Sequence, residues 1–154
     1  MHTSIGARIS RLRATFSEAD MFLGPPLEPA GMGALRDQAL SKLGMALPAS
    51  YLDFLCRHDG LVAEGVSLYS SIPYPYPDGG SAFAMIDMNL MARDLAFMVG
   101  FLELGASDMD CYVYESATGQ FQVRDRVAFD NVYEAFSSFD DLLGHVLELI
   151  EQRQ

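Results

Sequence analysis

The sequence predicts an α+β fold, in which a mainly antiparallel sheet of about four to six strands packs against N-terminal helices and a C-terminal helix. Three observations lead to this prediction. Apolar residues recur at helical spacing near the start, strand-like segments follow, and helical spacing returns near the end. A chain of 154 residues is long enough for one sizeable core and short for two, so we expect residues 1–154 to form a single domain.

The first two helices are predicted from apolar periodicity and from the prolines and glycines that interrupt it. Four apolar residues share one face of the first helix: Ile5, Ile9, Leu12 and Phe16. This helix should span residues 4–18. Residues 21–31 are rich in proline, which cannot continue a helix, so they indicate a connector. Residues 32–43 should form the second helix, which ends at Gly44.

Residues 47–61 are the best-marked segment of the chain. Pro48 suits a first helical turn, because its missing N–H would be unpaired there in any case. Gly60 suits the left-handed position after the last turn. Asp59 and Gly60 then lead into an apolar, strand-like run over residues 61–69. The segment is therefore predicted to be a corner between a helix and the sheet.

The clearest strand signal is a hairpin. Residues 111–115 and 121–125 contain side chains that favour strands, and they flank a turn in which Gly119 can adopt positive φ. Residues 95–102 are almost entirely apolar, as in a strand buried on both faces. Residues 127–136 are expected to add a short edge strand.

A helix should close the chain. Ser138 and Asp141 have the spacing of a capping box, with aspartate in the position usually taken by Glu or Gln. Five apolar residues then follow at helical spacing: Leu142, Leu143, Val146, Leu147 and Ile150. Residues 81–94 carry mixed signals and predict only a short helix.

The charge is strongly negative and unevenly distributed. The chain has 10 Lys and Arg against 21 Asp and Glu, a net charge of −11, and residues 103–154 alone carry 3 basic and 11 acidic groups. Such a surface repels phosphate backbones and favours basic protein partners, although charge kept for solubility is at least as good an explanation. We therefore expect no nucleic-acid partner, and we expect Arg8, Arg11 and Arg13 to offset neighbouring carboxylates.

Hydropathy and cysteine content indicate the compartment. No apolar run approaches the ~18 residues of a membrane span, and the first residues lack the apolar block of a secretory signal. We therefore expect a cytoplasmic protein without membrane contact. Cys56 and Cys111 form no Cys-x-x-Cys pair, which fits a reducing compartment, and both are expected in the core.

The sequence contains no recognisable catalytic constellation, cofactor motif or metal-ligand spacing. The acidic residues at 108–110 and 140–141 lack the remaining ligands of a calcium loop. Cys56 and His58 are two positions apart on a predicted helix, so they face away from each other and suggest no pair of nucleophile and base. We therefore predict no cofactor and no metal. At this point an enzyme stays possible only through residues scattered along the chain, a pattern that one sequence does not reveal.

Several short motifs, each weak alone, occur in an informative order. They are Leu47-Pro48, Tyr51, Phe54-Leu55 and Asp59-Gly60-Leu61, then an apolar strand ending in glycine over residues 95–105, then Asp110-Cys-Tyr-Val-Tyr-Glu, and finally Phe136-Ser-Ser-Phe-Asp-Asp-Leu-Leu. In this order and spacing they resemble the SUKH superfamily, in its branch of bacterial immunity proteins similar to the fungal cell-wall assembly regulator.

The resemblance covers residues 32–152. It implies that residues 1–20 are an added N-terminal helix, which the connector of residues 21–31 joins to the rest of a single SUKH-like domain. It implies an α+β fold and a non-enzymatic role in a bacterial polymorphic toxin system, where the protein binds and neutralises a partner toxin that is typically encoded nearby. Asp59 stands where the family usually has asparagine, which the turn should tolerate, and Leu61 stands where a second glycine is frequent. Residues 72–94 match no pattern of the family.

Prolines alternate with tyrosines in residues 72–77, which stiffens the backbone before a partner arrives and reduces the entropy lost on binding. Together with acidic residues, this segment supplies the predicted partner-binding set: Tyr74, Tyr76, Asp78, Asp108 and Asp110. Alternatively, one tyrosine folds back over the sheet as a lid. The alternative function is a small enzyme or small-molecule-binding protein with a pocket under residues 72–94. Without its partner, the protein should be a monomer or a weak homodimer.

Overall fold

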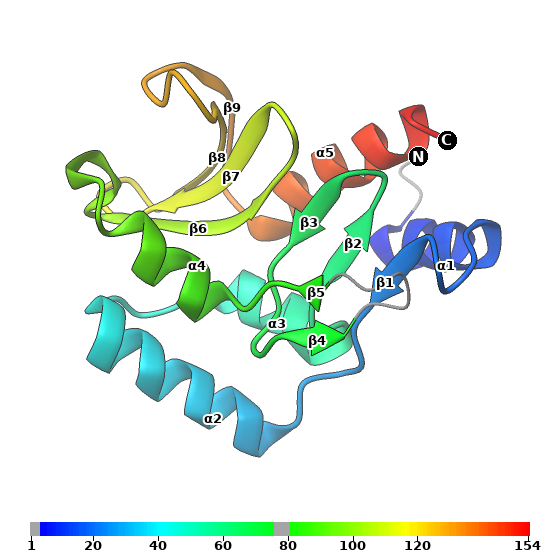
Figure 1. The fold of residues 1–154 in the computed structure, drawn as a ribbon, viewed down its shortest axis with the longest axis horizontal. Helices are drawn as coiled ribbons and strands as arrows, with labels where there is room; N and C mark the ends of the chain where they lie inside the picture. The colour runs from blue at the N-terminus through cyan, green and yellow to red at the C-terminus, as the bar shows by residue number, and fades with distance from the viewer. Residues whose placement is uncertain (1–3, 76–80) are drawn as a thin grey trace.

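The computed structural model describes residues 4–75 and 81–154. Over these residues the chain forms an α+β fold, as predicted, with one large antiparallel sheet and helices at both ends of the sequence (Figure 1). In sheet order, the seven described strands are β1 (Met21–Leu23), β2 (Leu61–Ala63), β3 (Val66–Leu68), β6 (Phe101–Ala106), β7 (Asp110–Glu115), β8 (Gln120–Asp125) and β9 (Val132–Phe136). A separate ribbon pairs β4 (Tyr74–Pro75) with β5 (Ser81–Ala82).

Helices pack against this sheet. They are α1 (Ile5–Thr15), α2 (Pro29–Gln38) with a π-helical continuation (Ala39–Leu43), α3 (Ala49–Arg57), α4 (Met85–Ala92), a 3-10 turn (Ala96–Met98) and α5 (Phe139–Gln152). Figure 1 shows α1 beside α5, and α4 in front of β6. Within the described residues, no helix is both long and apolar enough to cross a membrane.

The sheet has more strands than predicted, and two segments account for the difference. Residues 61–69 form the β2–β3 hairpin instead of a single strand, because Glu64 and Gly65 both have positive φ and reverse the chain. Residues 21–23, predicted to be part of a connector, pair with β2 as the edge strand β1. This pairing joins segments that are far apart in the sequence, so local composition does not reveal it.

Three predicted boundaries also shift. Helix α2 begins at Pro29, earlier than predicted, because proline is favourable in a first helical turn. The segment predicted as a strand over residues 95–102 contains the 3-10 turn, and β6 begins only at Phe101. The edge strand β9 occupies only the second half of residues 127–136.

The structure confirms the predicted turn and capping residues at the ends of three elements. Gly119 has a φ of 71° in the β7–β8 turn, and Gly44 ends the π-helical turn with a φ of 70°. The Ser138 hydroxyl accepts a hydrogen bond from the Asp141 N–H at 3.2 Å, which caps α5. These signals act over a few residues, so the sequence alone reveals them.

The main core lies on one face of the sheet and contains buried side chains from α1, α2 with its π-helical continuation, α3, α4 and α5. Its largest fully buried side chains include Leu12, Tyr51, Phe54, Leu55, Leu102, Leu104, Tyr112 and Phe139. The Phe139 ring lies 5.3 Å from the rings of both Tyr51 and Phe54. A smaller cluster on the opposite face of the sheet contains Met98, Cys111, Val113 and Phe129. Helix α4 contributes to both, because Met85 and Ile86 are buried in the main core and Ala92 packs against the smaller cluster.

The predicted role of the basic residues of α1 holds for one arginine and fails for another. Arg8 forms an ion pair with Glu151 of α5 and donates to the Gly144 carbonyl. Arg13 instead donates to three backbone carbonyls, those of Phe16, Ser17 and Met21. It therefore satisfies the carbonyl groups that follow α1 rather than a carboxylate.

Candidate functional site

The predicted partner-binding residues fall into separate regions. Tyr76 and Asp78 lie outside the described residues. Asp108 lies in the turn between β6 and β7 and forms an ion pair with Arg153 at 2.7 Å. Asp110 is the first residue of β7, so the structure brings these two aspartates together near the C-terminal end of α5. Tyr74 lies in the β4–β5 ribbon instead.

Tyr74 contacts a buried carboxylate. The Asp59 side chain is fully buried after α3, and its Oδ1 accepts a hydrogen bond from the Ser71 N–H at 2.7 Å. Its Oδ2 accepts from the Ser71 hydroxyl at 2.6 Å and from the Tyr74 hydroxyl at 2.7 Å. Burial and the hydrogen bond to Asp59 raise the pKa of Tyr74. Three donors thus compensate for the loss of hydration around this carboxylate.

The ring of Tyr74 also packs on Phe22 of β1, with centroids 5.3 Å apart. This arrangement corresponds to the folding-back alternative for the Tyr-Pro segment. The hydroxyl that would give Tyr74 a polar tip for a partner is already used within the protein. A role for Tyr74 in partner binding stays a prediction.

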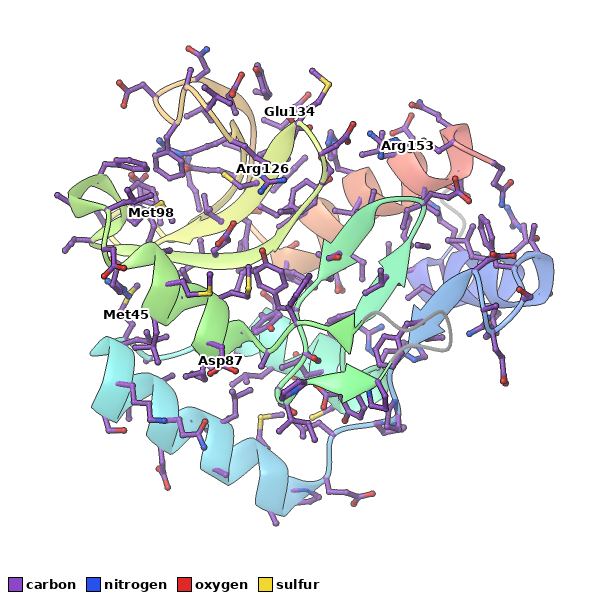
Figure 2. All side chains as sticks on the ribbon, viewed as in Figure 1. Met45, Asp87, Met98, Arg126, Glu134 and Arg153 are labelled. Atoms are coloured by element: carbon purple, nitrogen blue, oxygen red, sulfur yellow. The ribbon has the colours of Figure 1, made fainter. Side chains whose placement is uncertain are left out.

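Asp110 lines an acidic groove between the sheet and α5. The groove has a volume of about 370 Å³ and is lined by Asp110, Glu134, His145, Glu148, Leu149 and Gln152. Three of these six residues are carboxylates, and none is lysine or arginine. Figure 2 shows Glu134 on the sheet and Arg153 directly after the end of α5, both in the upper part of the view.

Strand register and helical spacing together build this groove. Tyr112 lies opposite Val123, and Val123 lies opposite Glu134, so these side chains share one face of the sheet. Asp110 is two residues before Tyr112 and therefore points to the same face. On α5, the wall is formed by residues three and four positions apart, which lie on one side of a helix: His145, Glu148, Leu149 and Gln152.

The electrostatics of the groove are unfavourable for additional negative charge. Burial raises the pKa of the Asp110 carboxyl, and the nearby charges of Asp125 and Asp108 raise it further, while His145 and Arg153 oppose this shift. A carboxylate with a raised pKa is one whose charge is poorly compensated by the protein itself. A cation in the groove would supply the missing compensation.

The opposite face of the sheet carries a different pair of pockets. One has a volume of about 220 Å³, and its lining includes Tyr69, Phe83, Met88 and Arg126. The other, of about 150 Å³, shares Arg126 and adds Glu103 and exposed Phe97. Arg126, which is labelled in Figure 2, lines both pockets. Burial raises the pKa of Glu103, and the Arg126 charge opposes this shift. Phe83 and Met88 belong to residues 72–94, where the alternative prediction expects a pocket.

The chemistry available in the described part of the chain is limited. Among these residues, no group of three or more His, Cys, Asp or Glu side chains could hold a metal ion. The prediction of two core thiols is wrong for Cys56, which is exposed because it lies on the outer side of α3, and is confirmed for Cys111. Burial raises the pKa of the Cys111 thiol to about 12, which makes it a poor nucleophile at neutral pH.

No protein-family profile and no curated protein matches the chain. The resemblance to the SUKH superfamily therefore stays a prediction. Of the acidic groove, the sequence identified Asp110 through the charge of the C-terminal part, but it did not identify Glu134 or Glu148. The spacing of His145, Glu148 and Gln152 could have indicated a polar side of α5, whereas the approach of Glu134 depends on the strand register.

Proposed function

We propose that this chain is a non-enzymatic, cytoplasmic binding protein, and that it acts as an immunity protein against a basic toxin domain of a bacterial polymorphic toxin system. The observation that carries this proposal is the acidic groove between β9 and α5, where Asp110, Glu134 and Glu148 line a concave surface without a lysine or arginine. Such a surface attracts a basic partner and suppresses acidic ones. The motifs that resemble the SUKH superfamily supply the biological role.

The Asp108–Arg153 ion pair lies close to the groove and already contains a cation of the protein itself. The guanidinium of Arg153 is held by the Asp108 carboxylate and by the Glu64 carbonyl at 3.0 Å. The hydrogen bond from Arg153 is the main reason why the pKa of Asp108 is lowered. This arginine is therefore already bound at Asp108, although its charge also acts to lower the pKa of Asp110. Among the described residues, none of Asp110, Glu134 and Glu148 forms an ion pair, which leaves these carboxylates for a partner.

A growth assay tests the proposal. The chain is expressed beside the product of the adjacent toxin-like gene, and we expect it to restore growth and to co-purify with that product. The double variant Glu134→Lys with Glu148→Lys should lose both effects, because two repulsive charges then face the cation. The matched control, Glu18→Lys with Asp37→Lys, makes the same change in net charge at exposed positions outside the groove. Equal protection by all three proteins would contradict a role for the groove, and no protection by any of them would contradict the immunity function.

Small-molecule binding is a second candidate, favoured by the 220 Å³ pocket in which Tyr69 and Arg126 meet the apolar side chains of Phe83 and Met88. This volume is below the ~300–1,000 Å³ that is common for ligand pockets, so the observation is weaker. Ligand screening by NMR would favour this candidate if a compound shifted the signals of Tyr69 and Arg126 and if Phe83→Ala abolished that shift.

A further inference from the structure

Strand β9 is an unpaired edge of the large sheet. It pairs with β8 on one side and with no other described strand on the other. Four of its five residues are exposed, and Val132 and Tyr133 are exposed large side chains. The opposite edge, β1, has three residues, of which Met21 is buried. Backbone N–H and C=O groups on an exposed edge can hydrogen-bond to an added strand, and β9 is the longer and more open of the two edges.

The acidic groove lies directly beside this edge. Glu134 is both the central residue of β9 and a lining residue of the groove, and Glu148 stands on the α5 wall. Side chains of a strand added to β9 would alternate between the two faces of the sheet. Every second side chain of that strand would therefore lie on the same face as Glu134, at the groove.

Charge decides between the possible occupants. An antiparallel pairing of β9 with its copy, centred on Glu134, would place two glutamates opposite each other, and each copy carries a net charge of −11. Both the repulsion between the two glutamates and the repulsion between the net charges of the two copies oppose self-association through this edge. The same charges attract a strand that carries lysine or arginine at alternate positions.

A bulge limits the length of this edge. The register between β8 and β9 shifts between Val123 and Arg124, and the Tyr133 hydroxyl donates to Asp125 Oδ2 at 2.6 Å. Bulges twist an edge away from long, flat pairing. A short strand centred on Glu134 therefore fits better than an extended one.

We propose that the partner docks by adding a short cationic strand to β9, with its lysine or arginine side chains directed to the groove lined by Asp110, Glu134 and Glu148. This inference rests on the proposed function for the identity of the partner. It adds the backbone contact, which a purely electrostatic association would lack.

The test uses the full chain and an acetylated, amidated peptide of sequence Lys-Val-Lys-Val-Lys-Val-Lys. Amide hydrogen exchange is measured by NMR with and without an excess of this peptide. We expect the exchange of amides within residues 132–136 to slow by about tenfold or more, because the added strand protects the edge. Amides of the opposite edge, β1, serve as the internal reference and should not change.

Two controls separate strand addition from simple charge attraction. A peptide with the same side chains and N-methyl groups on alternate amides keeps the charge and loses the hydrogen bonds, so it should give no protection. The Glu134→Lys protein should bind the original peptide about tenfold more weakly, while Glu18→Lys should bind it as the unchanged protein does. Circular dichroism verifies that both exposed substitutions leave the fold intact.

Three results would overturn the inference: protection that maps to another segment, equal binding of the N-methylated peptide, or unchanged affinity in Glu134→Lys. Its failure is distinguishable from failure of the proposed function. If the toxin-like product is neutralised while the edge shows no protection, the docking geometry is wrong and the function stands. If the edge is protected while growth is not restored, the immunity function is wrong and the strand site stands.

Discussion

Asp59 has a larger role than its position in a turn suggested. An asparagine at this position could accept hydrogen bonds with one side-chain oxygen only. Here both carboxylate oxygens accept, from the Ser71 N–H, the Ser71 hydroxyl and the Tyr74 hydroxyl. The aspartate therefore links the end of α3 to the ribbon that contains Tyr74.

Substitution of Asp59 measures this role. We expect Asp59→Ala to lower the free energy of unfolding by about 2–4 kcal/mol, because buried donors lose their acceptor. Tyr74→Phe removes a single hydrogen bond and should lower it by about 1 kcal/mol. Urea denaturation measures both values. If Asp59→Ala were as stable as the unchanged protein, the hydrogen bonds around this carboxylate would contribute nothing to the fold.

The two thiols should differ in reactivity. Cys56 is exposed, whereas Cys111 is buried in the smaller core cluster and its pKa is raised to about 12 by burial. At about pH 8, a disulfide reagent should modify Cys56 rapidly and Cys111 only after the protein unfolds. Mass spectrometry of the labelled peptides identifies the site. Rapid labelling of Cys111 in the Cys56→Ser variant would mean that the smaller cluster opens readily.

At the scale of elements, the loop between β8 and β9 is held by an arginine. The guanidinium of Arg124 lies 4.6 Å from the centroids of both Phe101 and Phe129. It also donates to the Phe129 carbonyl at 3.0 Å and to Gln122 Oε1 at 2.8 Å. The planar group thus fixes the loop to the face of the sheet opposite α5.

Lysine cannot replace this planar group. We expect Arg124→Lys to lower the free energy of unfolding by about 1–3 kcal/mol although the charge is kept, because stacking and two directed hydrogen bonds are lost. Arg126→Lys is the matched control at an exposed position, where a smaller change of less than about 1 kcal/mol is expected. Thermal denaturation compares the two. Equal effects would show that charge alone matters at Arg124.

The elements that the sequence predicted best carry their signals locally. Gly119 marks the β7–β8 turn, and Ser138 marks the start of α5, because positive φ and helix capping depend on neighbouring residues. Strand β1 was missed because its partner β2 is about forty residues away in the sequence. For the same reason the sequence predicted Asp110 through regional charge and missed Glu134, which joins it only through strand register.

At the scale of the whole molecule, the net charge of −11 opposes the compact state. The described residues form four ion pairs, which leaves most of the acidic groups without a cationic partner. We expect the melting temperature to rise as sodium chloride increases from about 0.05 M to about 0.5 M, because salt screens the repulsion. The Glu134→Lys and Glu148→Lys double variant should show a smaller rise. A melting temperature that falls with salt would mean that the ion pairs outweigh the repulsion.

The contact between α1 and α5 has a consequence for the order of folding. Arg8 and Glu151 are separated by 143 residues, whereas Tyr114 and Phe121 of the β7–β8 hairpin are separated by seven. On a logarithmic scale of loop closure, the long contact costs about 3 kcal/mol more than the short one when it forms first. The sheet should therefore nucleate at the β7–β8 hairpin, and α1 should dock after the rate-limiting step.

Rate measurements can resolve this order. Leu12→Ala in α1 should accelerate unfolding and leave the refolding rate nearly unchanged, while Val113→Ala in β7 should slow refolding. Stopped-flow chevron plots would separate the effect on the unfolding rate from the effect on the refolding rate. Helix α1 would then cover the core late in folding, and its detachment would be the earliest step in the unfolding of the native protein.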